Sequence, residues 1–162
     1  MESAINISRE IHCLKGHTGA VFSVKFNANG EYCLSCGEDK KVYLWNPHKG
    51  ILVNKYEGHN WEVLDVCCSK DNTQIASCGA GKKKKFKINF FFHSTLIDKQ
   101  AIVWDVMTGK QLKKIRAHTS RVTCVSFNSL NSLLFTGSYD RYFFFYFQFF
   151  LFIIFFFIFF YF

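Results

Sequence analysis

Short segments in which apolar and polar residues alternate recur along the chain and predict β-strands. Val21–Phe26 and Val122–Phe127 both show this pattern, which is typical of a strand with one buried face. Residues 32–35, 42–45 and 51–56 are further apolar segments, and turn-forming residues separate them at 27–30, 38–40 and 46–50. The pattern predicts four short strands joined by tight turns.

One set of residue types returns along the chain: a His, a Ser or Thr, an Asp and a Trp. Its members are His17, Ser35, Asp39 and Trp45, then His59, Ser77, Asp98 and Trp104, then His118, Thr136 and Asp140. The separation from His to Asp is 22 residues in the first and third sets and 39 in the second, an excess of 17. Segment 81–97 accounts for this excess. The chain is therefore a repeat of 42 residues that is interrupted once.

A period of about 40–45 residues, with Gly-His early and Trp-Asp late, is typical of a propeller blade with four strands. The pairs Gly16-His17 and Gly58-His59 open two units, and Trp45-Asn46 and Trp104-Asp105 follow later in them. On these motifs the chain resembles the WD-repeat family. The resemblance implies an all-β fold, a β-propeller fragment of four-stranded antiparallel blades. We expect two blades and part of a third, followed by a hydrophobic tail that folds as a helix.

The resemblance also implies that the repeated His, Ser or Thr, Asp and Trp residues form a hydrogen-bonded network inside each blade. An Asp in a turn can fix the tautomer of a His, and the hydroxyl and the indole N–H then have partners. Ser, His and Asp are also the residues of a catalytic triad. Because the set recurs in every unit, we interpret it as structural and predict neither an enzyme nor a cofactor or metal site.

The repeat divides the chain into five parts. We expect a leader at 1–12, a first repeat at 13–57 and a second at 58–116 that contains the insertion 81–97. A truncated third repeat at 117–141 and a tail at 142–162 follow. Since a closed propeller needs roughly 4–8 blades, we expect the chain to represent a fragment of a larger ring.

The formal net charge of +8 suggests an acidic partner at first sight. Five lysines lie in segment 81–97, which contains no Asp or Glu, so the remainder carries only +3. We therefore expect protein partners and no direct binding of nucleic acid by the repeats. The lysines at 82–87 next to aromatic residues leave open an import signal or a site for single-stranded nucleic acid.

The seven cysteines include one C-x-x-C pair, Cys33 and Cys36, on a predicted inner strand. A zinc site would need a second pair, so we interpret these residues as small core residues. Residues 1–9 lack the apolar core of a signal peptide. Reduced thiols then favour a cytoplasmic or nuclear location.

The insertion 81–97 and the tail 142–162 together contain 17 of the 21 phenylalanines. Lysine and phenylalanine runs correspond to AAA and TTT codons, so we interpret both segments as translated introns of an AT-rich gene. Removing 81–97 joins Ala80 to Asp98 and restores the repeat spacing. The alternative for the tail is a membrane anchor, because 21 uncharged residues in a helix would span about 32 Å.

Loops at the blade ends are the expected contact sites of such a scaffold. Trp61 and Glu62 follow His59, and Ser120 and Arg121 follow His118 at the same place of the repeat. Strings such as Leu44-Trp45-Asn46-Pro47 resemble a subfamily of single-propeller scaffolds in kinase cascades and spliceosomal complexes. The resemblance implies a non-catalytic protein–protein interaction scaffold. The alternative is a membrane protein that the tail anchors.

Overall fold

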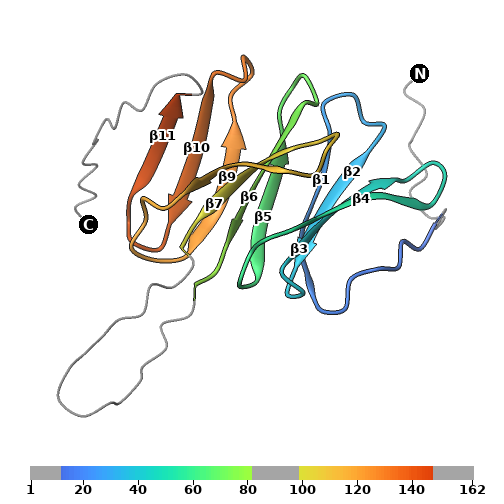
Figure 1. Ribbon diagram of the computed structural model, residues 1–162, viewed down its shortest axis with the longest axis horizontal. Coiled ribbons are helices and arrows are strands. Elements are labelled where there is room, and N and C mark those ends of the chain that lie inside the picture. Colours follow the sequence, from blue (N-terminus) through green and yellow to red (C-terminus); the bar gives the residue numbers. More distant parts are fainter. Residues whose placement is uncertain (1–11, 82–98, 148–162) are drawn as a thin grey trace, which may run out of the picture.

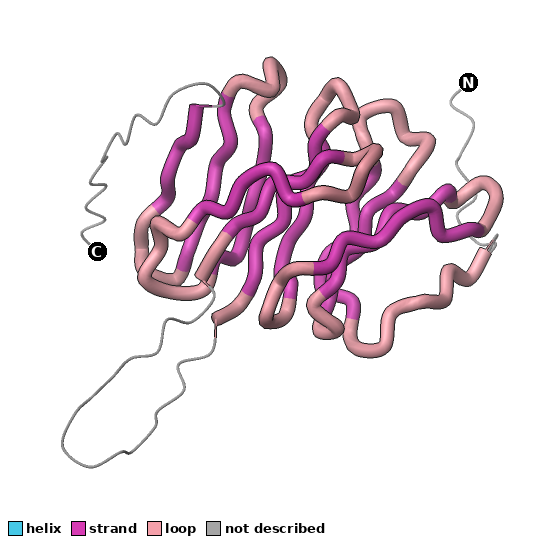
Figure 2. Tube along the Cα trace, viewed as in Figure 1, coloured by secondary structure: helices cyan, strands magenta, loops and turns pink. Residues whose placement is uncertain are grey.

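The computed structural model describes residues 12–81 and 99–147 as strands joined by loops (Figures 1 and 2). Three antiparallel sheets lie side by side in the order of the sequence, and we call them blades 1 to 3. Blade 1 consists of β1 (Val21–Phe26), β2 (Cys33–Gly37), β3 (Lys41–Asn46) and β4 (Ile51–Glu57). Blade 2 consists of β5 (Val63–Cys68), β6 (Gln74–Gly79), β7 (Ala101–Asp105) and β8 (Gln111–Ile115). Blade 3 consists of β9 (Val122–Phe127), β10 (Leu133–Ser138) and β11 (Phe143–Phe147).

Each sheet is a meander in which every strand pairs with the next one along the chain. The first strands of neighbouring blades, β1, β5 and β9, also contact one another. The part of the chain that the structure describes contains no helix. The expected all-β fold of four-stranded antiparallel blades is therefore confirmed, and the three sheets do not form a closed ring.

Blade 3 includes residues that the sequence interpretation assigned to a helical tail. Phe143–Phe147 forms a strand in which Phe143 pairs with Gly137 and Phe147 pairs with Leu133. The expectation of a helix is wrong for these five residues. Aromatic side chains favour strands, and successive side chains point to opposite faces. Phe144 and Tyr146 thus pack towards blade 2, next to the cluster that contains Val122.

The main apolar clusters lie between blades. The first joins Leu34, Val42, Leu44 and Tyr56 of blade 1 to Val63, Val66, Ile75, Ile102 and Trp104 of blade 2. The second joins Cys67, Ala76, Cys78, Ala101, Val103 and Ile115 of blade 2 to Val122, Val125, Leu134 and Tyr146 of blade 3. Burying one Val, Leu or Ile side chain contributes about 1.5–3 kcal/mol. Each blade is therefore stabilised by its neighbours.

A repeated turn contact adds a polar link between blades. Asn72 and Asn131 occupy the same place in the turn that follows the first strand of their blades, and both have positive φ angles, 58° and 55°. The Asn72 Oδ1 accepts the N–H of Ala28 at 3.3 Å, and the Asn131 Oδ1 accepts the N–H of Lys70 at 2.6 Å. Each turn thus holds the corresponding turn of the preceding blade.

Three predicted segments lie mostly or partly outside the described residues. The leader lies outside except for His12, and the insertion 81–97 lies outside except for Gly81. Asp98 and the part of the tail from residue 148 onward also lie outside. Within 12–81 and 99–147, no helix is long and apolar enough to cross a membrane.

Candidate functional site

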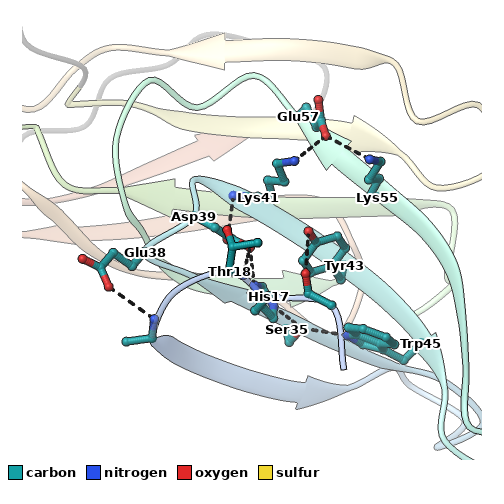
Figure 3. Close-up of polar contacts among 12 residues, drawn as sticks. His17, Thr18, Ser35, Glu38, Asp39, Lys41, Tyr43, Trp45, Lys55 and Glu57 are labelled. Carbon is teal, nitrogen blue, oxygen red and sulfur yellow. Dashed lines mark hydrogen bonds and ion pairs between the residues drawn. The ribbon is translucent and has the colours of Figure 1, made fainter. Parts of the chain in front are cut away.

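The repeated polar residues of blade 1 form one continuous network (Figure 3). Trp45 donates its indole N–H to the Ser35 Oγ at 2.7 Å, and the Ser35 Oγ lies 2.7 Å from the His17 Nε2. The His17 Nδ1 lies 2.8 Å from the Asp39 Oδ2. If the Nδ1 carries the proton, each donor has an acceptor, and the bonds run from Trp45 through Ser35 and His17 to Asp39.

Blade 2 forms the same network around the hydroxyl of Ser77. Trp104 donates its indole N–H to the Ser77 Oγ at 2.8 Å, and the Ser77 Oγ lies 2.8 Å from the His59 Nε2. Burial, with a smaller effect of the Lys114 charge, lowers the pKa of His59 to about 4. His59 is therefore neutral at physiological pH.

In blade 3 a threonine takes the place that a serine has in the networks of blades 1 and 2. The His118 Nε2 lies 2.9 Å from the Thr136 Oγ1, and its Nδ1 lies 3.0 Å from the Asp140 Oδ2. Burial opposes the ionisation of Asp140, but bonds from the N–H groups of Thr119 and Tyr142 and from His118 outweigh it and lower its pKa. The structure thus brings together ten of the eleven predicted network residues, and the eleventh, Asp98, lies outside the described residues.

The geometry of these hydroxyls is that of a structural network. Ser35, Ser77 and Thr136 are 5%, 0% and 1% exposed, so their hydroxyls are shielded from solvent. Each serine oxygen already contacts both a His ring and a Trp indole. A nucleophilic serine needs an open space beside it for the reacting atom, which the packed indole occupies here.

Asp65 joins the first strands of all three blades. Its carboxylate lies 2.8 Å from the Lys25 Nζ, and it accepts the Ser23 hydroxyl at 2.9 Å. It also accepts the N–H of Val125 in blade 3 at 3.1 Å. Because Asp65 is only 8% exposed, these partners compensate the free energy of burying its charge.

The predicted partner contacts lie on the loops that precede β5 and β9. Trp61 is half-buried, and the Lys40 Nζ of blade 1 lies 5.7 Å from the centre of its ring. The half-buried Glu62 accepts the N–H of Ala80 through its carbonyl at 2.8 Å. Ser120 is half-buried and Arg121 is exposed. The role of these four residues in binding a partner stays a prediction.

Lys40 and Lys99 occupy equivalent turns, and both reach the next blade. Lys40 lies over Trp61 of blade 2, and the Lys99 Nζ donates a hydrogen bond to the Thr119 carbonyl of blade 3. Sequence reasoning missed these contacts, the Asn72 and Asn131 turns and the hub at Asp65. The repeat could have indicated these contacts, because it places similar residues at equivalent positions of successive units.

The C-x-x-C pair belongs to the interior of blade 1. Cys33 and Cys36 are 5% and 0% exposed. Burial raises the pKa of the Cys36 thiol to about 12, which disfavours the thiolate that a metal or a redox reaction needs. Within residues 12–81 and 99–147, no group of three or more His, Cys, Asp or Glu side chains could hold a metal ion.

Comparison with known proteins agrees with this geometry. The family described as "WD domain, G-beta repeat" matches residues 8–46, 50–105 and 109–146. A WD repeat domain-containing protein 83 homolog of Dictyostelium discoideum is 33% identical over 129 residues, which is 79% of this chain and 34% of the relative. WD repeat domain-containing protein 83 of Xenopus laevis is 53% identical over 64 residues, 40% of this chain and 20% of the relative. Protein hir1 of Schizosaccharomyces pombe is 27% identical over 154 residues, 84% of this chain and 15% of the relative. The chain thus spans about a third or less of the length of these relatives.

Proposed function

This chain belongs to the family of WD-repeat proteins, and on that premise we propose that it acts as a non-catalytic scaffold that binds other proteins. The observation that carries the proposal is that the repeated Ser and His side chains already bond each other within the blades. Ser35, Ser77 and His59 are buried and His17 is half-buried. The blades therefore provide a rigid support, and the loops between them provide the surface for recognition.

The binding surface that we propose contains the loops before β5 and β9. Trp and Arg are enriched among the residues that dominate binding energy at protein interfaces, and these loops carry Trp61 and Arg121. Glu62 and Ser120 extend the same surface. The cation of Lys40 over the Trp61 ring holds that ring in place, with a contribution of about 0.5–1 kcal/mol. A ring that is fixed in advance loses less side-chain entropy when a partner binds.

Two settings for this scaffold are proposed, pre-mRNA splicing complexes and kinase-cascade assembly. The support is the resemblance of the string around Trp45 and of the segment Tyr56 to Asn72 to a single-propeller protein, the mitogen-activated protein kinase organiser. That protein is a kinase-cascade scaffold and a spliceosome-associated factor. The identity of 53% over 64 residues to a relative adds to this support. All seven cysteines are free in the structure, which favours a cytoplasmic or nuclear location.

Affinity purification of the full chain from nuclear and cytosolic extracts, followed by mass spectrometry, tests the proposal. We expect spliceosomal or kinase-cascade proteins to copurify with the chain. The double variant Trp61→Ala and Arg121→Glu should lose them at least tenfold. Leu130→Ala is the matched control, because Leu130 is 80% exposed on a turn at the opposite end of β9. Equal recovery by all three forms would overturn the proposed surface, and recovery of neither class of protein would overturn the proposed settings.

A further inference from the structure

One end of the three sheets presents a cation in every blade. The turn between the second and third strands places a Lys or an Arg directly after the network Asp, as Lys40 follows Asp39 and Arg141 follows Asp140. Lys99 takes this place in blade 2. Because each sheet is a meander, these turns and the loops before β1, β5 and β9 lie at the same end, which is the lower edge of the sheets in Figure 1.

The backbone at two of these positions has a conformation that a Lys or an Arg rarely adopts. Lys40 and Arg141 have positive φ angles of 69° and 72°. The other residues besides glycine with a positive φ in the described part of the chain are Asn72 and Asn131, and Asn tolerates this conformation. Glycine would adopt it without strain. Strained positions of this kind cluster at sites that bind ligands, which indicates a use for the two charged side chains.

The buried networks hold these turns and keep their carboxylates away from solvent. The Asp140 carboxylate lies 3.0 Å from the His118 Nδ1, and the Asp39 carboxylate makes the equivalent contact in blade 1 at 2.8 Å. The side chains of Asp39 and Asp140 are only 2% and 4% exposed, whereas Lys40 and Arg141 are exposed. A partner that approaches this end therefore meets the cations and not the carboxylates that precede them.

Blade 3 adds a second arginine beside its turn. The Tyr139 N–H donates to the Arg121 carbonyl at 3.1 Å, so the loop before β9 lies against the turn that carries Arg141. Both arginines are exposed, and within residues 12–81 and 99–147 neither forms an ion pair with a carboxylate. Two guanidinium groups at this end are therefore available to an anionic partner.

Few acidic side chains balance these cations. In the same loops, Glu38 and Glu62 are the described acidic residues outside the His networks. Glu38 accepts the N–H of Ala20 at 3.3 Å, and Glu62 is half-buried. The cations are distributed over three blades, which suits an extended chain with several charges better than a single phosphate group. We use the name cation surface for Lys40, Lys99, Arg121 and Arg141.

We propose that the cation surface binds an extended segment of a partner protein that is rich in Asp and Glu. The proposal rests on the scaffold function proposed above and names the chemistry of the partner. Arginine binds carboxylates through two parallel hydrogen bonds, so Arg121 and Arg141 give such a segment two anchor points. Single-stranded nucleic acid also carries several negative charges, but it relies on open aromatic faces for stacking. The Lys40 Nζ lies over the Trp61 ring, which favours the acidic protein segment.

The test titrates the full chain into a fluorescent peptide of alternating Glu and Gly and measures the fluorescence anisotropy. The same peptide with Gln in place of Glu is the uncharged comparison. We expect the Glu peptide alone to bind, with an affinity that falls as the salt concentration rises. The triple variant Lys40→Gln, Arg121→Gln and Arg141→Gln should weaken this binding about tenfold, because it removes three exposed ion pairs.

A second triple variant is the matched control. Lys49→Gln, Lys70→Gln and Lys110→Gln remove the same charge from exposed lysines in turns at the opposite end of the sheets. This variant should bind the Glu peptide within about twofold of the original chain, because its lysines lie outside the cation surface.

Arg141→Gly separates binding from folding. Glycine relieves the strained backbone at this position, so the midpoint of urea unfolding should stay equal or rise while the affinity for the Glu peptide falls. Arg141→Lys retains the charge and should retain most of the binding. A variant Arg141→Gly that binds the Glu peptide as tightly as the original chain would contradict the role of this side chain.

Three results would overturn the proposal: equal affinity for the Glu and Gln peptides, equal losses in the two triple variants, or tighter binding of an oligouridine of the same charge. Recovery of partner proteins from extracts by a chain that does not bind the Glu peptide would overturn the acidic chemistry and leave the scaffold function intact.

Discussion

Tyr146 occupies in blade 3 the place that Trp104 occupies in blade 2, but only Trp104 reaches the hydroxyl at the centre of its network. Trp104 donates to the Ser77 Oγ at 2.8 Å. The buried hydroxyl of Tyr146 forms no hydrogen bond of good geometry among the described residues. It lies close enough to Thr136 for that side chain to oppose the rise that burial causes in the Tyr146 pKa. The aromatic ring thus fills the position, while the well-formed hydrogen bond that an indole would donate is missing.

Replacing Tyr146 with Trp should therefore stabilise the chain. An indole N–H directed at the Thr136 Oγ1 adds a buried hydrogen bond, and the substitution removes an unsatisfied hydroxyl, for a gain of about 1–2 kcal/mol. The measurement is the midpoint and slope of urea unfolding. Tyr146→Phe is the control, since it removes the hydroxyl without supplying a donor and should gain less than Tyr146→Trp. A lower midpoint for Tyr146→Trp would contradict the assignment of this position.

His59 makes the stability of the chain depend on pH. Burial lowers its pKa to about 4 in the folded state, whereas an unfolded His titrates near about 6.5. Between these values the unfolded chain binds a proton that the folded chain does not, so the free energy of unfolding rises with pH across this window. Lowering the pH from 7 to 5 should remove about 2 kcal/mol through this residue.

Urea unfolding at pH 7 and pH 5 measures this effect, and His59→Gln provides the comparison. All other residues are the same in the two proteins, so the difference between the two pH dependences isolates His59. The variant should lose about 2 kcal/mol less than the original chain over this interval. Identical pH dependences would show that His59 does not titrate as its burial requires.

The Asn131 turn should stabilise the junction between blades 2 and 3. Asn131→Gly removes the side chain that accepts the Lys70 N–H at 2.6 Å. Glycine tolerates the positive φ of this turn, as Gly30 does at the same place in blade 1 with a φ of 76°. The substitution therefore isolates the hydrogen bond, and the loss should be about 0.5–1.5 kcal/mol.

Hydrogen exchange resolves where that loss occurs. The amides of β9 and β10 should exchange faster in Asn131→Gly than in the original chain, while those of β1 and β2 should not change. Asn29→Gly is the control, because Asn29 lies in the equivalent turn of blade 1 and its side chain bonds Glu31 of that same turn. Equal acceleration in blades 1 and 3 would contradict a local role for the Asn131 turn.

The insertion 81–97 predicts a specific feature of the messenger RNA. If the segment is a translated intron, the mature transcript joins codon 80 to codon 98 and places Asp98 directly after Ala80. Asp98 then stands 22 residues after His59, as Asp39 stands after His17 and Asp140 after His118. Sequencing the transcript across these codons tests the interpretation. A mature message that encodes residues 81–97 would refute it.

Much of the fold and of the network could be predicted from the sequence, because the same residue pattern occurs in three units of the chain. The hydrogen bonds among His17, Ser35, Asp39 and Trp45 were expected from the resemblance to the WD-repeat family, and the structure forms them. β1 and β9 have the predicted bounds. Contacts between blades were not predicted, because they depend on how two sheets pack. Asp65 shows this, as its partners Ser23 and Val125 lie 42 and 60 residues away.

Phe143–Phe147 is a segment for which composition misleads. Uncharged aromatic residues favour a membrane helix by length and hydropathy, but Phe143–Phe147 forms a strand instead. The edge of β10 offers backbone groups for pairing, and the side chains of five consecutive aromatic residues alternate between two faces, one of which packs on blade 2. Hydropathy alone could not distinguish these outcomes for a segment without polar residues.

The structure predicts that the buried hydroxyls support the blades. Ser77 tests it most directly, because it is 0% exposed and contacts both His59 and Trp104. Ser77→Ala leaves a buried indole N–H and a buried imidazole without their partner, at about 1–3 kcal/mol for each group. Equilibrium urea unfolding should therefore show a loss of about 2–5 kcal/mol. An unchanged free energy of unfolding would contradict the structural role of the network.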